Sequence, residues 1–230
     1  MKKANKKVNA TIIIIGNEIL SGRTQDVNVV AISNWLNELG VKLEEVRIIS
    51  DIEDSIVKTI NNVRKKFNYV FTTGGIGPTH DDITSKSIAK AFNISYGYHK
   101  EAYEILKQYY GKSEFNEGRK KMAMLPDKAL LILNPSSGAP GFIVDNVYCL
   151  PGVPSILKSM LGGLNDKIKG GKKILSKTIN LRTVESEIAE SLEEIQNKFK
   201  DIEIGSYPFF RLGKVGVSIV IRSTEEKLIS

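Results

Sequence analysis

The sequence predicts an α/β fold with a mostly parallel sheet, followed by a small C-terminal α+β unit. From residue 10 to residue 150, strand-like apolar segments alternate with segments of helical periodicity, which is the pattern of βαβ units. Residues 10–15 form a run rich in isoleucine, which is typical of a strand buried on both faces of a parallel sheet. After residues 169–173 the pattern changes to strands around a single helix.

The first strands and helices follow in order. After strand 10–15, Asp26 is a candidate N-cap of a helix that Gly40 ends, because the apolar residues between them share one face. Ser50 and Glu53 have the spacing of a capping box and open the next helix. Two further strands are expected on either side of this helix, at residues 41–49 and 67–73.

The chain beyond the third strand is less regular. A glycine-rich segment leads to a short helix that Thr84 caps and Phe92 ends. Asp145 and Asn146 are expected to form a turn. The other expected elements are helices at residues 99–110, 114–124 and 154–168 and strands at residues 129–133 and 147–150.

Residues 169–173 are predicted to be a linker between a first domain at 8–168 and a second at 172–230. In the second domain, apolar residues alternate with others from Val215 to Ile221, as in a half-exposed antiparallel strand. The domain is expected to have the order β-α-β-β, with strands near 175–181, 202–207 and 215–221 and a helix near 188–199.

Composition excludes several classes. Hydrophobic residues make up 41% and charged residues 26% of the 230 residues, which are globular proportions. The single cysteine, Cys149, excludes an intramolecular disulfide and is expected in the core. No apolar run is long enough to cross a bilayer, and no secretory core follows the basic residues 1–7. We therefore expect a cytoplasmic protein without a membrane partner.

The formal net charge of +7 raises the question of nucleic-acid binding. Most lysines are dispersed, however, and aromatic residues do not interleave with them as a stacking platform requires. The charge therefore favours a solvated surface with affinity for anionic ligands over a nucleic-acid interface.

Three unusual loops follow predicted parallel strands, at residues 16–28, 74–82 and 151–154. The carboxyl ends of parallel strands share one sheet edge, where ligands bind near the point at which strand order reverses. We therefore expect the three loops to converge on one crevice.

The second loop carries the strongest chemical pattern. Gly74, Gly75 and Gly77 allow backbone amides to approach a phosphate, although the spacing fits neither the P-loop nor the dinucleotide fingerprint and a plain tight turn is the alternative. Asp81 and Asp82 follow, either as helix caps or as oxygen ligands of a divalent cation such as Mg²⁺.

Further candidates lie on the neighbouring loops. Glu18 is either a ligand carboxylate or an ordinary loop acid, and Asp51 either faces the same edge or caps a helix. The stretch from Ser136 to Gly141, which includes the candidates Ser137 and Gly138, is either an anion nest or a plain turn. The other candidate ligand-binding residues are Arg23, Asn28, Thr79, Pro151 and Gly152.

These motifs resemble a known family. The string TGGIGPT from Thr73 to Thr79, followed by DDIT from Asp81, resembles the signature of the MoaB/Mog (molybdopterin-binding) domain. The string GNEILSGR from Gly16 is similar to the CinA branch of that family. Four further strings support the CinA resemblance, which extends to the end of the chain: SGAPG, LPGVP, ESEIA and GSYP.

The resemblance implies a three-layer α/β/α fold with a pocket at the strand carboxyl ends, and a homo-oligomer. Molybdenum-pathway members bind molybdopterin there, whereas CinA-type domains are associated with metal-dependent hydrolysis of ADP-ribose. Asp82 and Asp51 match acidic positions of the family. Asn17 stands where the family usually has aspartate, and Ser155 replaces a frequent glutamate.

Two functions follow from this resemblance. The first is hydrolysis of a pyrophosphate such as ADP-ribose, with Mg²⁺ or Co²⁺ held by Asp81 or Asp82 and Arg23 neutralising charge. The second is a non-catalytic module that binds molybdopterin or a nucleotide in molybdenum cofactor metabolism. Asn17 favours the second function, and the paired aspartates favour the first.

Overall fold

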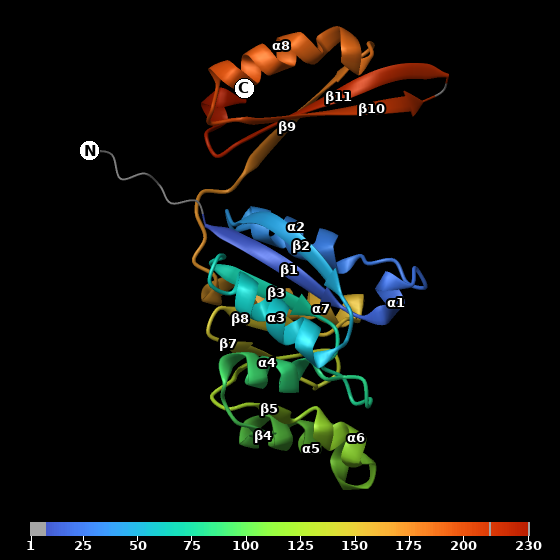
Figure 1. Cartoon of the computed structure of the whole chain (residues 1–230), viewed down its shortest axis with the longest axis vertical. Helices are drawn as coiled ribbons and strands as arrows, with labels where there is room; N and C mark the ends of the chain where they lie inside the picture. The colour runs from blue at the N-terminus through green and yellow to red at the C-terminus, as the bar shows by residue number, and fades with distance from the viewer. Residues whose placement is uncertain (1–7, 212, 230) are drawn as a thin grey trace, which may run out of the picture. The chain divides into compact units, whose positions relative to one another are not determined.

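The computed structural model describes residues 8–211 and 213–229 and divides the chain into two compact units, with the boundary in the sequence between Gly171 and Lys172 (Figure 1). The basic residues 1–7 and Ser230, the last residue of the expected second domain, lie outside the described part. Among the described residues, no helix has the length and apolar composition that a membrane span requires.

The first unit is built on a six-stranded sheet with the order β2-β1-β3-β8-β7-β6. Four neighbouring strands run parallel, and β7 and β6 add two antiparallel pairings, which confirms the mostly parallel sheet. The strands are β1 (Asn9–Ile15), β2 (Lys42–Ile49), β3 (Tyr69–Thr73), β6 (Leu130–Ile132), β7 (Gly141–Val144) and β8 (Val147–Leu150).

Helices cover both faces of this sheet, as expected for a three-layer fold. One hydrophobic cluster joins β1 through Ile12 and Ile14 to α2 (Asn28–Glu38) and α7 (Pro154–Leu161). The other joins β1 through Ile13 and Ile15 to α3 (Glu53–Val63), α4 (Thr84–Phe92) and α5 (Lys100–Glu114). Successive side chains of a strand point to opposite faces, so a strand buried on both faces needs a continuous apolar run.

Several short elements differ from the sequence prediction. The helix expected at residues 114–124 is only α6 (Glu117–Lys121), and Met124 already belongs to β5 (Met124–Pro126). β5 pairs with β4 (Tyr96–Tyr98). β7 lies partly in the expected loop and forms a hairpin with β8 through the predicted turn at Asp145, whose φ is 54°. Two further short elements are α1 (Asn17–Leu20) and a 3₁₀ helix (Gly162–Lys167).

Two of the three predicted helix caps are wrong. Thr84 is the first residue of α4, and its hydroxyl donates to the carbonyl of Gly74 at 3.0 Å. The capping box of Ser50 and Glu53 does not form, because Ile52 precedes α3 and makes no side-chain cap bond. Asp26, in contrast, accepts a hydrogen bond from the amide of Val29 at 2.9 Å.

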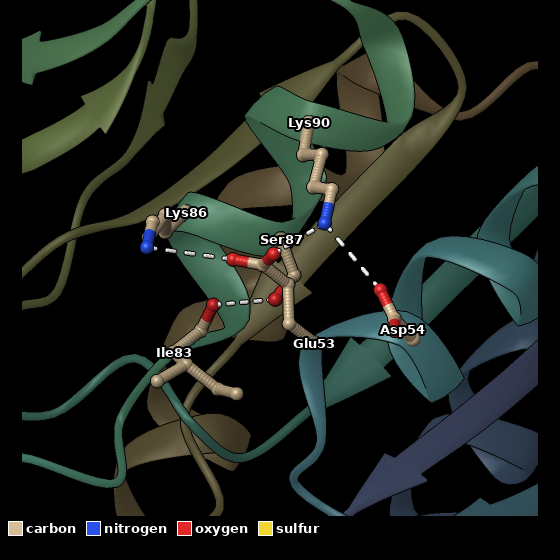
Figure 2. A network of polar contacts seen from close by, with 6 residues as sticks. All are labelled: Glu53, Asp54, Ile83, Lys86, Ser87 and Lys90. Atoms are coloured by element: carbon tan, nitrogen blue, oxygen red, sulfur yellow. Dashed lines mark hydrogen bonds and ion pairs between the residues drawn. The ribbon is translucent and has the colours of Figure 1, made fainter.

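Glu53 instead joins α3 to α4 (Figure 2). Its carboxylate pairs with Lys86 and Lys90, and Lys90 also reaches Asp54. The hydrogen bond from Lys90 is the main reason that the pKa of Glu53 lies below its usual value. Lys86, Lys90 and Asp54 are exposed and Glu53 is partly exposed, so the network joins α3 to α4 but stabilises the fold little.

The second unit has the predicted order β-α-β-β. Its elements are β9 (Leu175–Leu181), α8 (Glu185–Lys198), β10 (Glu203–Arg211), β11 (Lys214–Ser223) and a 3₁₀ helix (Glu226–Leu228). β11 lies between the other two strands and is antiparallel to both. Val217 and Ile219 are buried and Ser218 between them is half-buried, as the alternation predicts, but Val215 at the start of the strand is exposed.

Candidate functional site

The site lies where the strand order of the first unit reverses. β2 pairs with one edge of β1 and β3 pairs with the other, so the loops that follow β1 and β3 leave the sheet side by side. A cavity of about 650 Å³ opens there. All three loops that the sequence predicted to converge contribute to its wall, through Gly16 and Glu18, through residues 74–78, 81 and 82, and through residues 151–153.

The glycine-rich loop is held tightly at its start. Gly74 has a φ of 95°, and a Cβ there would lie well inside 3.0 Å of the Ile15 carbonyl oxygen. Gly75 has a φ of 70°, and its Cβ would overlap the hydroxyl of Thr84. The amide of Gly74 donates to the carbonyl of Leu150 at 3.1 Å, and the amide of Thr84 donates to the carbonyl of Gly75 at 2.9 Å. Only glycine fits these two positions, where the chain passes between β1, β8 and α4.

The same loop has amides that are not engaged in hydrogen bonds within the described part of the chain. Because the Gly74 amide is bonded to Leu150, it is not available to a ligand. Among the described residues, no hydrogen bond engages the amides of Gly75, Ile76 and Gly77, which all line the cavity. This run of successive free N–H groups can bind an anion.

Asp81 and Asp82 converge on one side chain. The hydroxyl of Thr79 lies 2.5 Å from a carboxylate oxygen of each aspartate, and its amide donates to Asp82 at 2.8 Å. The hydrogen bond from the Thr79 hydroxyl is the main cause that lowers the pKa of Asp81 below its usual value, with smaller contributions from the backbone, His80 and Lys121. Both aspartates line the cavity; Thr79 itself does not.

This pair fits a hard divalent cation. Mg²⁺ is commonly held by one or two carboxylates, with water and substrate phosphates completing its shell. In the part of the chain that the structure describes, no group of three or more His, Cys, Asp or Glu side chains is placed to hold a metal. The chain would therefore supply the two adjacent carboxylates, and a ligand and water would supply the remaining oxygens.

Two more acids reach the cavity, Glu18 from the first loop and Asp51 from the segment that follows β2. The Glu18 carboxylate lies against Gly16, where a Cβ would be 2.5 Å from it. Asp51 also lines the wall, and its carboxylate accepts a hydrogen bond from the side-chain amide of Asn17. Asn17, which stands where the family usually has aspartate, therefore donates a hydrogen bond to a carboxylate oxygen of Asp51 instead of adding a negative charge.

Other predicted residues lie around the cavity. Arg23 is exposed and does not line it. Asn28 is only 3% exposed, donates to the carbonyl of Gly152 at 2.8 Å and lines a neighbouring cavity of about 90 Å³. Pro151 and Gly152 line the main cavity.

The first amides of the expected anion nest are occupied within the chain. The amides of Ser136 and Ser137 both donate to the side-chain oxygen of Asn134, at 2.9 and 3.1 Å. Gly138 packs against Tyr109, whose Cγ would be 2.6 Å from a Cβ at that position. Ser137 and Asn134 still line the cavity, so this loop contributes its shape.

One wall of the cavity consists of residues that the sequence pattern does not indicate. Tyr110, Arg119 and Met122 come from α5, α6 and the residue after α6. Arg119 lies 4.1 Å from the centre of the Tyr110 ring. Their sequence pattern resembles an ordinary charged helix surface, and only the folding back of this segment brings them to the glycine-rich loop.

Comparisons with known proteins agree with this geometry. Residues 11–169 match the family described as "Probable molybdopterin binding domain", and residues 173–230 match the family described as "FAD synthase, middle domain". A protein of Archaeoglobus fulgidus is 32% identical over 197 residues, which cover 86% of this chain and 84% of that protein.

Two CinA relatives are also similar. A CinA-like protein of Prochlorococcus marinus is 31% identical over 94% of this chain, but the chain spans only 53% of that protein. The crystal structure of a CinA protein of Thermoplasma acidophilum, described as having unknown function, superposes with a TM-score of 0.65. It is 32% identical and covers 69% of this chain and 96% of its own. The chain therefore belongs to the molybdopterin-binding domain family and is a protein of the CinA/MoaB type.

Proposed function

We propose that the cavity binds a small molecule with a diphosphate group, such as ADP-ribose, and hydrolyses its phosphoanhydride bond with a divalent cation. The observation that carries this proposal is the juxtaposition, on one loop, of free amides at Gly75–Gly77 and the paired carboxylates of Asp81 and Asp82. A diphosphate held by the amides would bring its oxygens beside these carboxylates. The size of the cavity supports the proposal as well, because small-molecule sites typically occupy about 300–1,000 Å³.

The loop residues divide into those that would bind the diphosphate and those that would bind the cation. The amides of Gly75, Ile76 and Gly77 would bind the non-bridging oxygens of the diphosphate. Asp81 and Asp82 would hold Mg²⁺ or Co²⁺, and Thr79 orients both carboxylates. When bound, such a cation polarises phosphoryl oxygens and lowers the pKa of water. From ADP-ribose the products would be AMP and ribose 5-phosphate.

A second function is binding without chemistry, with molybdopterin or a nucleotide as the ligand in molybdenum cofactor metabolism. Asn17 in place of the family's usual aspartate supports this alternative, because it leaves the site with one carboxylate fewer, and its side-chain amide donates to Asp51. The homo-oligomer and the cytoplasmic location implied earlier stay predictions.

The test is release of AMP from ADP-ribose by the purified chain with Mg²⁺ or Co²⁺, measured by chromatography. Asp82→Asn removes one carboxylate charge at the site. Asp145→Asn is the matched control, because the same change is made in the β7–β8 turn. This turn lies at the amino end of β8, whereas the site lies at the carboxyl ends of the parallel strands. We expect Asp82→Asn to lower turnover about 100-fold or more and Asp145→Asn to leave it unchanged.

The outcomes separate the two functions. Binding of ADP-ribose without turnover in the parent chain would contradict the hydrolase and support the binding module. If ADP-ribose does not bind, the substrate assignment is wrong, and molybdopterin becomes the ligand to test.

A further inference from the structure

The cavity is unbalanced in charge. Its wall carries four carboxylates, those of Glu18, Asp51, Asp81 and Asp82, and among the described residues one cationic side chain, Arg119. A diphosphate carries at least two negative charges, and amides alone offer only partial positive charge. A cation bound at the aspartates would offset part of this negative charge. Arg119 is the side chain on the wall that can offset more of it.

Arg119 is placed on the glycine-rich loop by its helix. Lys121 donates from its ammonium group to the carbonyl of Thr79, and Gly118 approaches Pro78 so closely that a Cβ would lie 3.6 Å from the Pro78 carbonyl oxygen. α6 therefore packs against the loop that bears the free amides and the aspartates. Figure 1 shows α6 at the end of the first unit that carries β4 and β5.

The guanidinium group of Arg119 is only partly engaged. Its Nη1 donates to the carbonyl of Glu114 and lies 3.1 Å from the Glu114 carboxylate. Among the described residues, its Nε and Nη2 make no hydrogen bond, and the side chain is 30% exposed. These two atoms form one edge of the planar fork, and such an edge binds phosphate through two parallel hydrogen bonds.

Its neighbours fix the plane of the guanidinium group. Tyr110 stacks beneath it at 4.1 Å, and the contact with Glu114 holds one end. Because the group is already oriented, less side-chain entropy is lost when a ligand binds.

We infer that Arg119 is the residue that binds a phosphate of the ligand through its Nε–Nη2 edge and supplies the positive charge that sequence reasoning assigned to Arg23. This inference rests on the proposed function, since it requires a phosphorylated ligand in the cavity. Arg23, exposed and off the cavity wall, is then an ordinary surface residue.

The test measures binding by calorimetry for three ligands: ADP-ribose, inorganic pyrophosphate and adenosine. Arg119→Ala is compared with Lys120→Ala, which makes the same charge change one residue away. Lys120 pairs with Glu117 at 2.6 Å and does not line the cavity. We expect Arg119→Ala to weaken ADP-ribose and pyrophosphate binding about 10- to 100-fold and to leave adenosine unaffected. Lys120→Ala should bind all three as the parent does.

Two further measurements exclude a merely structural role. Millimolar guanidinium ion should restore part of the lost affinity of Arg119→Ala, because it can occupy the vacated position. Arg119→Lys should bind the phosphorylated ligands less tightly than the parent, since an ammonium group lacks the planar fork. If Arg119→Ala fails to fold, Arg119→Lys and Arg119→Gln carry the comparison.

The results distinguish this inference from the proposed function. If the parent binds the phosphorylated ligands and Arg119→Ala binds them equally well, the inference is wrong and the proposed function stands. Binding of pyrophosphate but not of ADP-ribose would remove the proposed substrate, and the pyrophosphate affinities of the variants would still decide the role of Arg119. If the parent binds neither, both fail.

Discussion

Replacement of Gly74 by alanine tests whether the glycine-rich loop is held as described. The residue has a φ of 95°, and the new Cβ would overlap the carbonyl oxygen of Ile15. Ile15 ends β1, a central strand that pairs on both sides, so its carbonyl has little freedom to move.

The expected magnitude has two parts. A non-glycine residue in a left-handed conformation costs about 1–2 kcal/mol. Forcing additional atoms into a packed site costs about 1–3 kcal/mol more. The free energy of unfolding of the first unit should therefore fall by about 2–5 kcal/mol, a large share of a typical stability of about 5–15 kcal/mol.

Urea unfolding followed by tryptophan fluorescence measures this loss. Trp35 is the single tryptophan of the chain and packs edge-on against Phe71 at 5.7 Å, so its signal reports the first unit. Gly22→Ala is the matched control, because Gly22 also has a positive φ, of 72°, but a Cβ on Gly22 would meet no neighbouring atom within 4 Å. Gly22→Ala should lose only the conformational part, about 1–2 kcal/mol.

Equal shifts of the urea midpoint for Gly74→Ala and Gly22→Ala would contradict the expected overlap with Ile15. That result would mean that the loop moves away from β1 without cost and that the close approach of Gly74 to Ile15 does not fix it.

Three other changes have defined outcomes. Burial raises the pKa of Cys149 to about 12. The folded protein should therefore not react with a thiol reagent at pH 8, whereas the unfolded protein should react. The stability that comes from keeping this thiol neutral is present below its unfolded pKa of about 8.5 and is lost as the pH rises toward 12. Thr79→Val should raise the pKa of Asp81 toward its usual value in an NMR titration. Because the pKa of Asp81 is lowered in the folded protein, the stabilisation by this carboxyl is present above about pH 4 and is lost as the pH falls. Glu53→Gln should cost at most about 1 kcal/mol in a urea titration, and high salt should reduce the difference because Lys90 is exposed and Glu53 is partly exposed; a larger, salt-independent loss would contradict this interpretation.

Sequence periodicity predicted the elements that are long or buried on both faces. β1 needs apolar residues on both sides and therefore has an unmistakable apolar run, and the alternation in β11 indicated the antiparallel strand of the second unit. β4 and β5 have only three residues each, too few to show a period, and their pairing depends on contacts distant in sequence.

The candidate site divides in the same way. Glycines and acids at the ends of parallel strands predicted the crevice, because sheet topology brings those ends together. Arg119 could not be predicted, since α6 is a short, charged segment whose role arises only from its packing on Thr79 and Pro78. The stretch from Ser136 to Gly141 has the residue types of an anion nest, but the side chain of Asn134 accepts hydrogen bonds from the amides of Ser136 and Ser137, a local contact that the sequence pattern does not show.

A crystal structure of the chain with Mn²⁺ and a methylene-bridged analogue of ADP-ribose, which cannot be hydrolysed at the bridge, would show whether a diphosphate and a metal occupy the glycine-rich loop together. We expect the diphosphate analogue on the amides of Gly75, Ile76 and Gly77, with the anomalous signal of manganese beside Asp81 and Asp82. An analogue bound elsewhere, or manganese away from both aspartates, would contradict this expectation.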